Sequence, residues 1–287
     1  SISLIYNKGK LVYGLTRGDG KIGEDVTQNL KMISSIPQQI DNDLERFEVR
    51  GEIYITFEQF KKINDAILDE DKKFANPRNA AAGTLRRLNP ELVKQRNMKM
   101  AAYYIPDSEN LKTLGITKQS EVMELLRKYG FHTAKETYLV SNVKDLYEKI
   151  KYLEDNQDNV EYPIDGAVIK VNDITLYSTM GTTSKFPHWA TAYKFVPKEA
   201  ETKVLDIIAN VGRTGKITYV AKLTPVALSG STISSATLNN AEYIASKDIR
   251  INDTVKIFKA AEIIPYVKET VLSKRPADSK PFTAINN

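Results

Sequence analysis

The stretch Ala190-Thr191-Ala192-Tyr193-Lys194-Phe195-Val196-Pro197 marks a change in the sequence pattern of the chain. Upstream of it, runs with the alternation of β-strands are interspersed with amphipathic segments of helical period. Downstream of Pro197, helical periodicity almost disappears and short runs rich in β-branched residues take over. The sequence therefore predicts an α+β domain over residues 1–196 and an all-β domain over residues 197–287.

The downstream domain contains five predicted strands, the number found in an OB-fold barrel. They are Val204–Val211, Ile217–Leu228, Thr232–Ala236, Thr254–Lys259 and Ile264–Leu272. We expect these strands to close into a small barrel. Residues 273–287 contain two prolines and predict a C-terminal linker.

The upstream domain is predicted to begin with a β-hairpin and to alternate strands with helices. The predicted strands cover residues 1–6, 10–15, 47–55, 98–105, 164–171 and 190–196. The predicted helices are one that follows Thr56 as N-cap, one over 79–88, one over 117–129 that ends at Gly130, and one over 141–153 with Ser141 as N-cap.

Composition excludes several classes of protein. No apolar run approaches the roughly 18 residues that a membrane-spanning helix needs. The 287 residues include no cysteine, which excludes disulfides and any Cys-ligated zinc or iron–sulfur site within this chain. Two histidines, His132 and His188, are too few for a histidine-rich metal site.

Positive charge is concentrated in the C-terminal third. The whole chain has a formal net charge of +5, and residues 197–287 carry 13 Lys/Arg against 9 Asp/Glu, a net charge of +4. Such an excess fits a solvated basic face, or a surface that contacts the phosphate backbone of a nucleic acid.

Four charged residues on three predicted strands are candidates for one pocket, with Asp165 and Lys170 on the same strand. Glu52 and Asp165 supply carboxylates, and Lys170 and Lys194 supply ammonium groups within otherwise apolar runs. Lysines are rarely fully buried without a partner, so the set suggests polyanion handling, with lysines on phosphates and carboxylates on a metal or sugar hydroxyl. Each lysine could instead be a strand-end residue in solvent. Arg50, on the same strand face as Glu52, could form a structural ion pair with it.

An alanine-rich block, Phe74-Ala75-Asn76-Pro77-Arg78-Asn79-Ala80-Ala81-Ala82-Gly83, is the second candidate site. If its helix starts near Asn79, Arg78 and Arg86 flank the first turns. A helix N-terminus together with arginines suits phosphate binding. The alternative is that both are surface arginines on a good helix former.

Six motifs, taken in order, resemble those of the bacterial NAD-dependent DNA ligases. They are Thr16-Arg17-Gly18-Asp19-Gly20, Val49-Arg50-Gly51-Glu52, Asn76-Pro77-Arg78-Asn79-Ala80-Ala81-Ala82-Gly83, Ile164-Asp165-Gly166-Ala167-Val168-Ile169-Lys170-Val171, Trp189-Ala190-Thr191-Ala192-Tyr193-Lys194-Phe195 and Val211-Gly212-Arg213-Thr214-Gly215. The stretch Ser235-Ala236-Thr237-Leu238-Asn239-Asn240-Ala241 is also similar to that family. The resemblance covers essentially the whole chain.

The resemblance implies an ATP-grasp-like nucleotidyltransferase (adenylation) domain followed by an OB-fold domain. In the family, a lysine attacks the α-phosphate of NAD to give lysyl-AMP, AMP passes to the 5′-phosphate of a nick in duplex DNA, and the 3′-hydroxyl displaces it. Magnesium assists. The implied partners are nicked duplex DNA and NAD or AMP, with no membrane, and the implied state is a monomer in the bacterial cytoplasm at the nucleoid.

The resemblance also implies roles for individual residues. At the nucleotide, Glu52 corresponds to the glutamate at the AMP ribose, and Tyr103 to the ring that stacks on adenine. Lys170 and Lys194 correspond to the two lysines at the AMP site, and Asp165 to the acidic residue of the metal-assisted steps, with magnesium.

Further implied contacts are with phosphates and DNA. Arg17 and Arg78 correspond to arginines at the nucleotide phosphates, and Arg78 and Arg86 to those at the nick. In the OB-fold domain, Arg213, Thr214 and Lys259 are the expected DNA contacts. These assignments agree with the chemistry of the residue types, because cations face phosphates and a ring faces a base.

The chain also departs from the family's pattern. The nucleophilic lysine belongs to a lysine–x–aspartate–glycine motif that would lie five residues before Ser1, so we expect no self-adenylation by this chain alone. The module that recognises nicotinamide mononucleotide and the downstream zinc-finger, helix–hairpin–helix and BRCT parts are expected outside it; zinc would be found only there. Gln157 stands where the family usually has an arginine, and the turn Ala260–Pro265 differs from the usual one.

Two alternatives remain open at this point. The chain could be an inactive nucleic-acid-binding fragment, in which an OB-fold module is attached to a scaffold without chemistry. It could also be a relative of the ATP-dependent ligases, RNA ligases or capping enzymes, although the Asn76–Gly83 and Val211–Gly215 motifs favour the NAD-dependent family.

Overall fold

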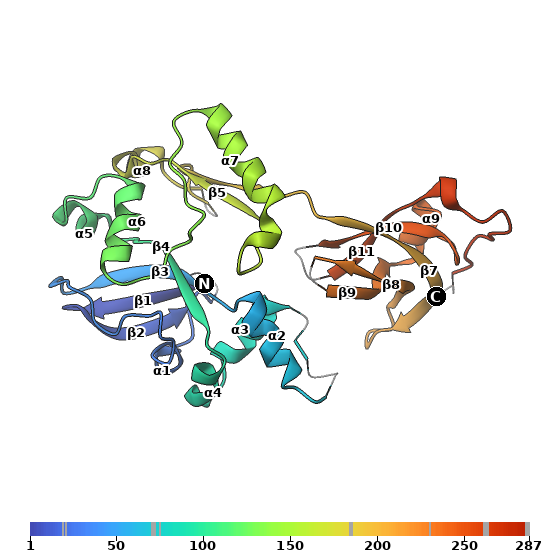
Figure 1. Ribbon diagram of the computed structural model, residues 1–287, viewed down its shortest axis with the longest axis horizontal. Helices are drawn as coiled ribbons and strands as arrows, with labels where there is room; N and C mark the ends of the chain where they lie inside the picture. The colour runs from blue at the N-terminus through green and yellow to red at the C-terminus, as the bar shows by residue number, and fades with distance from the viewer. Residues whose placement is uncertain are drawn as a thin grey trace. The chain divides into compact units, whose positions relative to one another are not determined.

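The computed structural model describes residues 1–18, 20, 22–69, 73–74, 76–183, 186–229, 231–260 and 264–284. The chain forms two compact units, Ser1–Lys194 and Phe195–Asn287, and each is described by itself (Figure 1). Within the described ranges no helix is both long and apolar enough to cross a membrane.

A four-stranded antiparallel sheet forms the centre of the first unit, in the order β2-β1-β3-β4. Its strands are β1 (Ile2–Asn7), β2 (Lys10–Thr16), β3 (Phe47–Tyr54) and β4 (Lys99–Tyr104). The turn between β1 and β2 requires a glycine, because Gly9 has a φ of 76° and an added Cβ would lie 2.3 Å from the carbonyl oxygen of Ile40. The predicted hairpin and the two later strands are confirmed.

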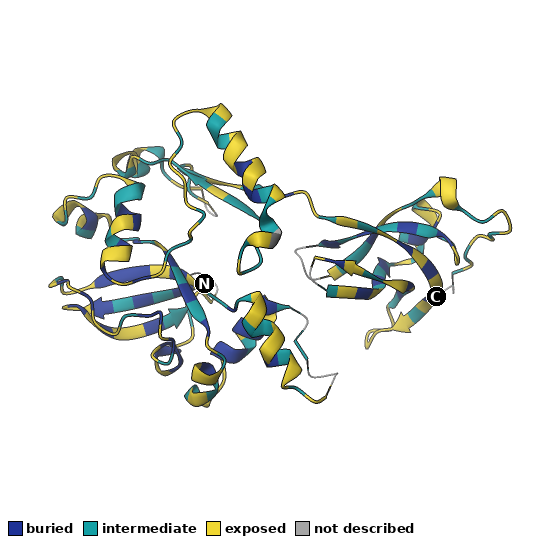
Figure 2. Ribbon diagram, in the orientation of Figure 1, coloured by how far each residue is buried: buried dark blue, intermediate teal, exposed yellow. Residues whose placement is uncertain are grey.

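The first unit also contains helices, and some of them pack against this sheet. The α-helices are α1 (Thr27–Leu30), α2 (Phe57–Asp65), α3 (Pro77–Leu85), α4 (Pro90–Gln95), α5 (Ser108–Thr113), α6 (Gln119–Lys128), α7 (Val143–Asp155) and α8 (Tyr177–Met180), and the 3₁₀ turns are η2 (Gln157–Asn159) and η3 (Ile174–Leu176). Helix α3 packs against β3 and α6 against β4. The side chains of Leu4, Tyr6 and Phe47 are completely buried in the hydrophobic core of this unit. Figure 2 shows buried positions along the strands of the sheet.

Side-chain caps fix where the helices begin, and two of them correct the predictions. The hydroxyl of Thr56 accepts a hydrogen bond from the Gln59 amide, as predicted for α2. Helix α3 begins at Pro77 instead of Asn79, because Asn76 is its N-cap and accepts from the Asn79 amide at 2.8 Å. It ends at Leu85, three residues before the predicted end. Helix α7 is capped by Asn142 and not by Ser141.

A second, two-stranded sheet carries the later motifs of the first unit. Strands β5 (Gly166–Lys170) and β6 (Ala190–Lys194) are antiparallel, with Gly166 opposite Lys194 and Lys170 opposite Ala190. Helix α7 packs against β5. The pairing places the two predicted site lysines at opposite ends of one small sheet.

The second unit is a closed barrel with strand order β10-β11-β9-β8-β7, which confirms the predicted OB-fold class. Its strands are β7 (Glu199–Val211), β8 (Ile217–Leu228), β9 (Ser231–Asn239), β10 (Thr254–Ala260) and β11 (Ile264–Thr270). A helix that the sequence did not predict, α9 (Ala241–Ser246), is capped by Asn240 and buries Ile244 in the barrel core.

The segment after β11 is not a free linker over its described residues. It begins with the 3₁₀ turn η4 (Leu272–Lys274) and then packs against the barrel. The Phe282 ring lies edge-on to Tyr219, with centroids 5.8 Å apart. The Arg275 guanidinium binds both carboxylate oxygens of Asp253, at 3.0 and 2.8 Å, and the Asp253 side chain is completely buried. The linker prediction failed because irregular backbone with prolines can still carry anchoring side chains.

Arg275 should therefore stabilise the second unit. We expect Arg275→Met to lower the free energy of unfolding by roughly 3 kcal/mol, because it leaves the buried Asp253 carboxylate without its cation. Equilibrium urea denaturation measures this. Lys274→Met is the matched control: Lys274 pairs with Glu201 at the surface, and its loss should change stability by less than about 1 kcal/mol. Equal effects of the two variants would contradict the anchoring role.

Candidate functional site

Lys170, at the end of β5, has the most unusual environment of the predicted site residues. Its Nζ donates a hydrogen bond to the carbonyl oxygen of Tyr103 at 3.2 Å. The same ammonium lies over two aromatic rings, 5.4 Å from the centroid of Tyr103 and 5.6 Å from that of Tyr104. Burial lowers the pKa of Lys170 to about 8, because a desolvated ammonium is less stable than a hydrated one. The Lys170 ammonium is thus poorly solvated where it lies between the two rings and the carbonyl.

At the other end of the same sheet, Lys194 forms an ion pair with Asp165. Its Nζ lies 2.6 Å from Oδ2 of Asp165, and the side chains are 67% and 44% exposed. Such an exposed pair contributes little to stability. Both groups are therefore accessible to a ligand, which could take over either partner.

Strand β3 supplies carboxylates to the neighbouring surface. The side chain of Glu52 is half exposed. Arg50 pairs with Glu48 at 2.9 Å, and not with Glu52. Burial disfavours the charge on Glu48, but hydrogen bonds from Arg50 and Arg46 outweigh it and hold the pKa of Glu48 below its usual value. Glu52 is thereby left available for a role other than pairing with Arg50.

Tyr103 lies beside these groups, on β4. It lies at the register shift between the cross-strand pairs Arg50–Tyr104 and Gly51–Ala102. Burial, and secondly the charge of Glu52, raise the pKa of Tyr103, while the positive charge of Arg17 acts in the opposite direction. The structure therefore brings Glu52, Tyr103, Lys170 and Arg17 into one neighbourhood.

The arginines of the alanine-rich block lie apart from each other. Arg78 is exposed in the first turn of α3, but Arg86 is the C-cap at the opposite end. The expectation that both flank the first turns is wrong for Arg86, because α3 ends at Leu85. Arg86 forms an exposed ion pair with Glu24, with Nε to Oε2 at 3.1 Å.

In the barrel, the expected DNA contacts have different surroundings. Arg213 and Thr214 are exposed in the tight β7–β8 turn, which is closed by a hydrogen bond from the Gly215 amide to the Gly212 carbonyl. Lys259 is buried, and its ammonium donates to Ser231 Oγ at 2.5 Å. The turn presents its cation to solvent, whereas Lys259 is engaged inside the unit.

Two departures from the resemblance can also be placed. Gln157, in η2, donates its side-chain amide to the carbonyl of Glu154 at 2.9 Å, so it is engaged with α7. Within the turn Ala260–Pro265, residues 261–263 lie outside the described residues.

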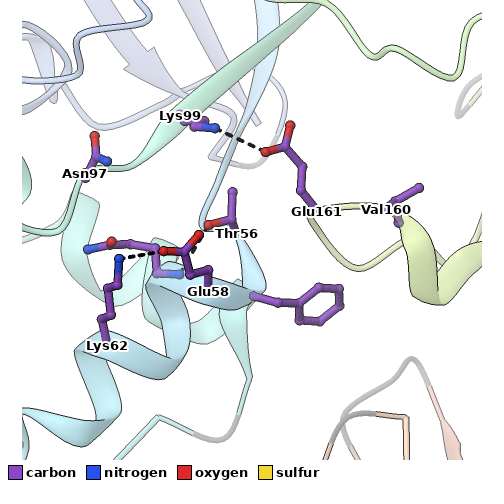
Figure 3. Close-up of a pocket in the computed structure, with 9 residues that line it drawn as sticks. Thr56, Glu58, Lys62, Asn97, Lys99, Val160 and Glu161 are labelled. Carbon is purple, nitrogen blue, oxygen red and sulfur yellow. Dashed lines mark hydrogen bonds and ion pairs between the residues drawn. The ribbon is translucent and has the colours of Figure 1, made fainter.

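A pocket of about 400 Å³ lies elsewhere in the first unit, at the start of α2 (Figure 3). Its lining is Thr56, Phe57, Glu58, Gln59, Lys62, Asn97, Lys99, Val160 and Glu161. The charges that line it are paired, Lys99 with Glu161 at 3.2 Å and Lys62 with Glu58 at 2.6 Å. None of the sequence-predicted site residues lines this pocket.

An aromatic stack beside Lys170 was not predicted. Trp189 stacks on Tyr177, with centroids 3.9 Å apart and planes 4° apart, and also contacts Tyr104 at 5.8 Å. The signal was present in the sequence, because Trp189 is the only tryptophan and immediately precedes β6. Its pairing with Tyr177 depends on tertiary structure.

The part of the chain that the structure describes contains no group of three or more His, Asp or Glu side chains placed to hold a metal ion. Asp165, which directly precedes β5, would supply one carboxylate beside the β5–β6 sheet. One carboxylate together with substrate phosphates is a donor set that suits magnesium.

Comparison with known proteins covers both units. The family described as NAD-dependent DNA ligase adenylation domain matches residues 1–198, and the family described as NAD-dependent DNA ligase OB-fold domain matches residues 201–279.

Curated relatives named DNA ligase match along almost the whole chain. That of Ureaplasma parvum serovar 3 is 46% identical over 289 residues, covering 100% of this chain and 42% of the relative. That of Mycoplasma capricolum is 52% identical over 274 residues, covering 94% and 40%. The chain therefore spans about two fifths of the length of these relatives. A solved structure from a study of Lig E DNA ligases covers 94% of this chain and 89% of its own, at a TM-score of 0.44 and 13% identity, too weak a likeness to carry an argument.

The close approach of β5 and β6 gives a test of the site's architecture. A Cβ at Gly166 would lie 2.3 Å from the backbone oxygen of Tyr193, so Gly166→Ala should push the strands apart and destabilise the first unit by about 2 kcal/mol. The fluorescence of Trp189, the only tryptophan, should shift to the red as its surroundings open.

Gly83→Ala in α3 is the control, since its added Cβ meets only the Phe74 ring edge at 3.4 Å. It should leave the fluorescence unchanged and stabilise the helix slightly. An unaltered spectrum and unfolding curve for Gly166→Ala would show that the pairing is not as tight as described.

Proposed function

The chain belongs to the NAD-dependent DNA ligases, and we propose that it forms the adenylation and OB-fold core of an enzyme that seals nicks in duplex DNA with NAD as the AMP donor. The proposal rests above all on one observation. Lys170 is a desolvated ammonium beside the Tyr103 ring, and the Glu52 carboxylate acts on the same tyrosine. A cation, a ring and a carboxylate match the phosphate, adenine and ribose of AMP.

The reaction we propose has three transfers. A lysine supplied from outside this chain attacks the α-phosphate of NAD, forming a P–N bond and releasing nicotinamide mononucleotide. The AMP then passes to the 5′-phosphate of a nick, and the 3′-hydroxyl displaces AMP and completes the phosphodiester. In each transfer negative charge develops on phosphate oxygens, and fixed cations in a partly dry site stabilise it.

Each proposed role is assigned to a residue of this chain by its position in the site. Lys170 holds the AMP phosphate, and Lys194 reaches it after exchanging its contact with Asp165 for the nucleotide. Glu52 accepts hydrogen bonds from the ribose hydroxyls, and Tyr103 stacks on adenine. Arg17 and Arg78 are the proposed contacts with the other phosphates.

Magnesium, when bound, polarises a phosphoryl oxygen. Asp165 would hold it, because this carboxylate is half exposed on the sheet that carries both lysines.

The nucleic-acid partner is assigned to the barrel and to α3. Arg213 and Thr214 present a cation and a hydroxyl in an exposed turn, which suits contact with DNA phosphates. Arg86 would exchange Glu24 for a phosphate at the nick. Lys259 would need to leave Ser231 to do the same. We also propose that the protein is a monomer and that it acts at the nucleoid in the bacterial cytoplasm.

The adenylation role is tested by intact-mass measurement of the full-length protein incubated with magnesium and either NAD or ATP. We expect an AMP adduct with NAD alone. Lys170→Ala should reduce adduct formation by at least 100-fold, because it removes several kcal/mol of charge stabilisation. Lys149→Ala, an exposed lysine of α7, is the control and should form the adduct at the normal rate.

Other outcomes separate the alternatives. An adduct with ATP alone would place the protein with the ATP-dependent ligases. Absence of any adduct, together with binding to nicked DNA, would favour a nucleic-acid-binding fragment. Normal adduct formation by Lys170→Ala would remove Lys170 from the site.

The DNA role of the β7–β8 turn makes a separate prediction. Arg213→Ala should weaken binding to nicked duplex DNA and reduce the slope of log K against log salt by about one, because one fewer counterion is released. Fluorescence anisotropy across a salt series measures both quantities. Lys203→Ala, at an exposed position on β7, serves as the charge-matched control. An unchanged slope for Arg213→Ala would exclude a phosphate contact by this turn.

A further inference from the structure

Lys170 is held by aromatic side chains and not by a carboxylate. None of the ion pairs among the described residues includes it, and its ammonium instead meets the rings of Tyr103 and Tyr104 and one carbonyl. An aromatic face attracts a cation through its quadrupole and excludes water at the same time. Tyr103 is already assigned to the base, so Tyr104 has no role in the proposed reaction.

Tyr104 is the first member of a stack that supports the end of β5. Trp189 lies between Tyr104 and Tyr177, with centroid distances of 5.8 and 3.9 Å. The hydroxyl of Tyr177 donates to the carbonyl of Val171 at 2.7 Å, and the Val171 amide donates to the carbonyl of Trp189 at 2.9 Å. The stack therefore contacts the Lys170 ammonium at one end and holds the backbone that follows Lys170 at the other.

We propose that Tyr104 is a positioning residue for Lys170: its ring, braced by Trp189 and Tyr177, fixes the ammonium where the nucleotide phosphate binds and keeps water from it. The expected effect of Tyr104 on the rate of adenylation rests on the proposed function. Its expected effect on the pKa and position of Lys170 does not. The ring therefore acts through Lys170 and needs no contact with the substrate.

The titration of Lys170 can be distinguished from that of the groups around it. Tyr103 and Tyr104 face it from β4, and Tyr177 lies at the far end of the stack. Burial raises the pKa of Tyr103 and of Tyr104, and raises that of Tyr177 to about 12. The charges of β3 act on these tyrosines: Glu48 and Arg50 on Tyr104, and Arg50 and Glu52 on Tyr103. With these tyrosines titrating higher, a midpoint near pH 8 belongs to Lys170.

Competitive acylation of the nucleotide-free, full-length protein, read by peptide mass spectrometry, gives the titration midpoint of each lysine. We expect a Lys170 midpoint near 8 in the wild type and in Tyr104→Phe, which keeps the ring. Tyr104→Ala admits water and should raise the midpoint by a pH unit or more. Tyr147→Ala, on an exposed position of α7, is the matched control and should leave it unchanged.

Adenylation by NAD gives the second readout. Its rate should fall about tenfold in Tyr104→Ala and recover in Tyr104→Phe. A folded Tyr104→Ala protein with a wild-type Lys170 midpoint overturns the proposal, whether or not the protein is a ligase. A normal shift of the midpoint without any adenylation in the wild type would support the proposal and overturn the proposed function.

Tyr104→Leu covers the case in which the alanine variant does not fold. Leucine keeps an apolar side chain beside Lys170, so the Lys170 titration midpoint should not rise. It removes the aromatic face, so the rate of adenylation should fall about tenfold. A wild-type rate in Tyr104→Leu, with Trp189 fluorescence unchanged, overturns the role of the ring.

Discussion

The charge on Lys170 is the constraint that organises the first unit's site. An ammonium beside two rings and a single carbonyl is poorly solvated, and its lowered pKa expresses that free-energy penalty. An arriving phosphate relieves the penalty by supplying the missing anion. In the proposed function, this site would bind an anion more strongly than an exposed lysine could, because the unfavourable desolvation is already present in the free protein.

The small β5–β6 sheet makes this arrangement possible. Its pairing places Lys170 and Lys194 at opposite ends, one shielded by rings and the other exposed with Asp165. The two lysines therefore differ in character although both occupy strands. A shielded lysine suits a fixed contact with phosphate, whereas an exposed and exchangeable ion pair suits a group that changes partner during a reaction.

The sequence predicted the fold class and most strands because those depend on local patterns. The alternation of polar and apolar residues in β1, β2 and β8 predicted these strands. The loss of helical periodicity after Pro197 predicted the all-β domain. Errors arose where a side chain decides a boundary. Helix α3 is capped by Asn76 and helix α7 by Asn142. The sequence did not predict either N-cap, because several polar residues nearby are of a type that could cap equally well.

The candidate site was only partly predictable for a different reason. Residue type identified Glu52, Asp165, Lys170 and Lys194 as chemistry-bearing, and motif order suggested what they bind. Nothing in the local sequence indicates that Tyr104 would lie over Lys170, since the two are on strands of different sheets. The surroundings of a charged group come from tertiary contacts, and those contacts set its pKa. A motif therefore predicts which lysine meets the phosphate, while the neighbouring rings, which the motif does not include, determine how well that lysine is solvated.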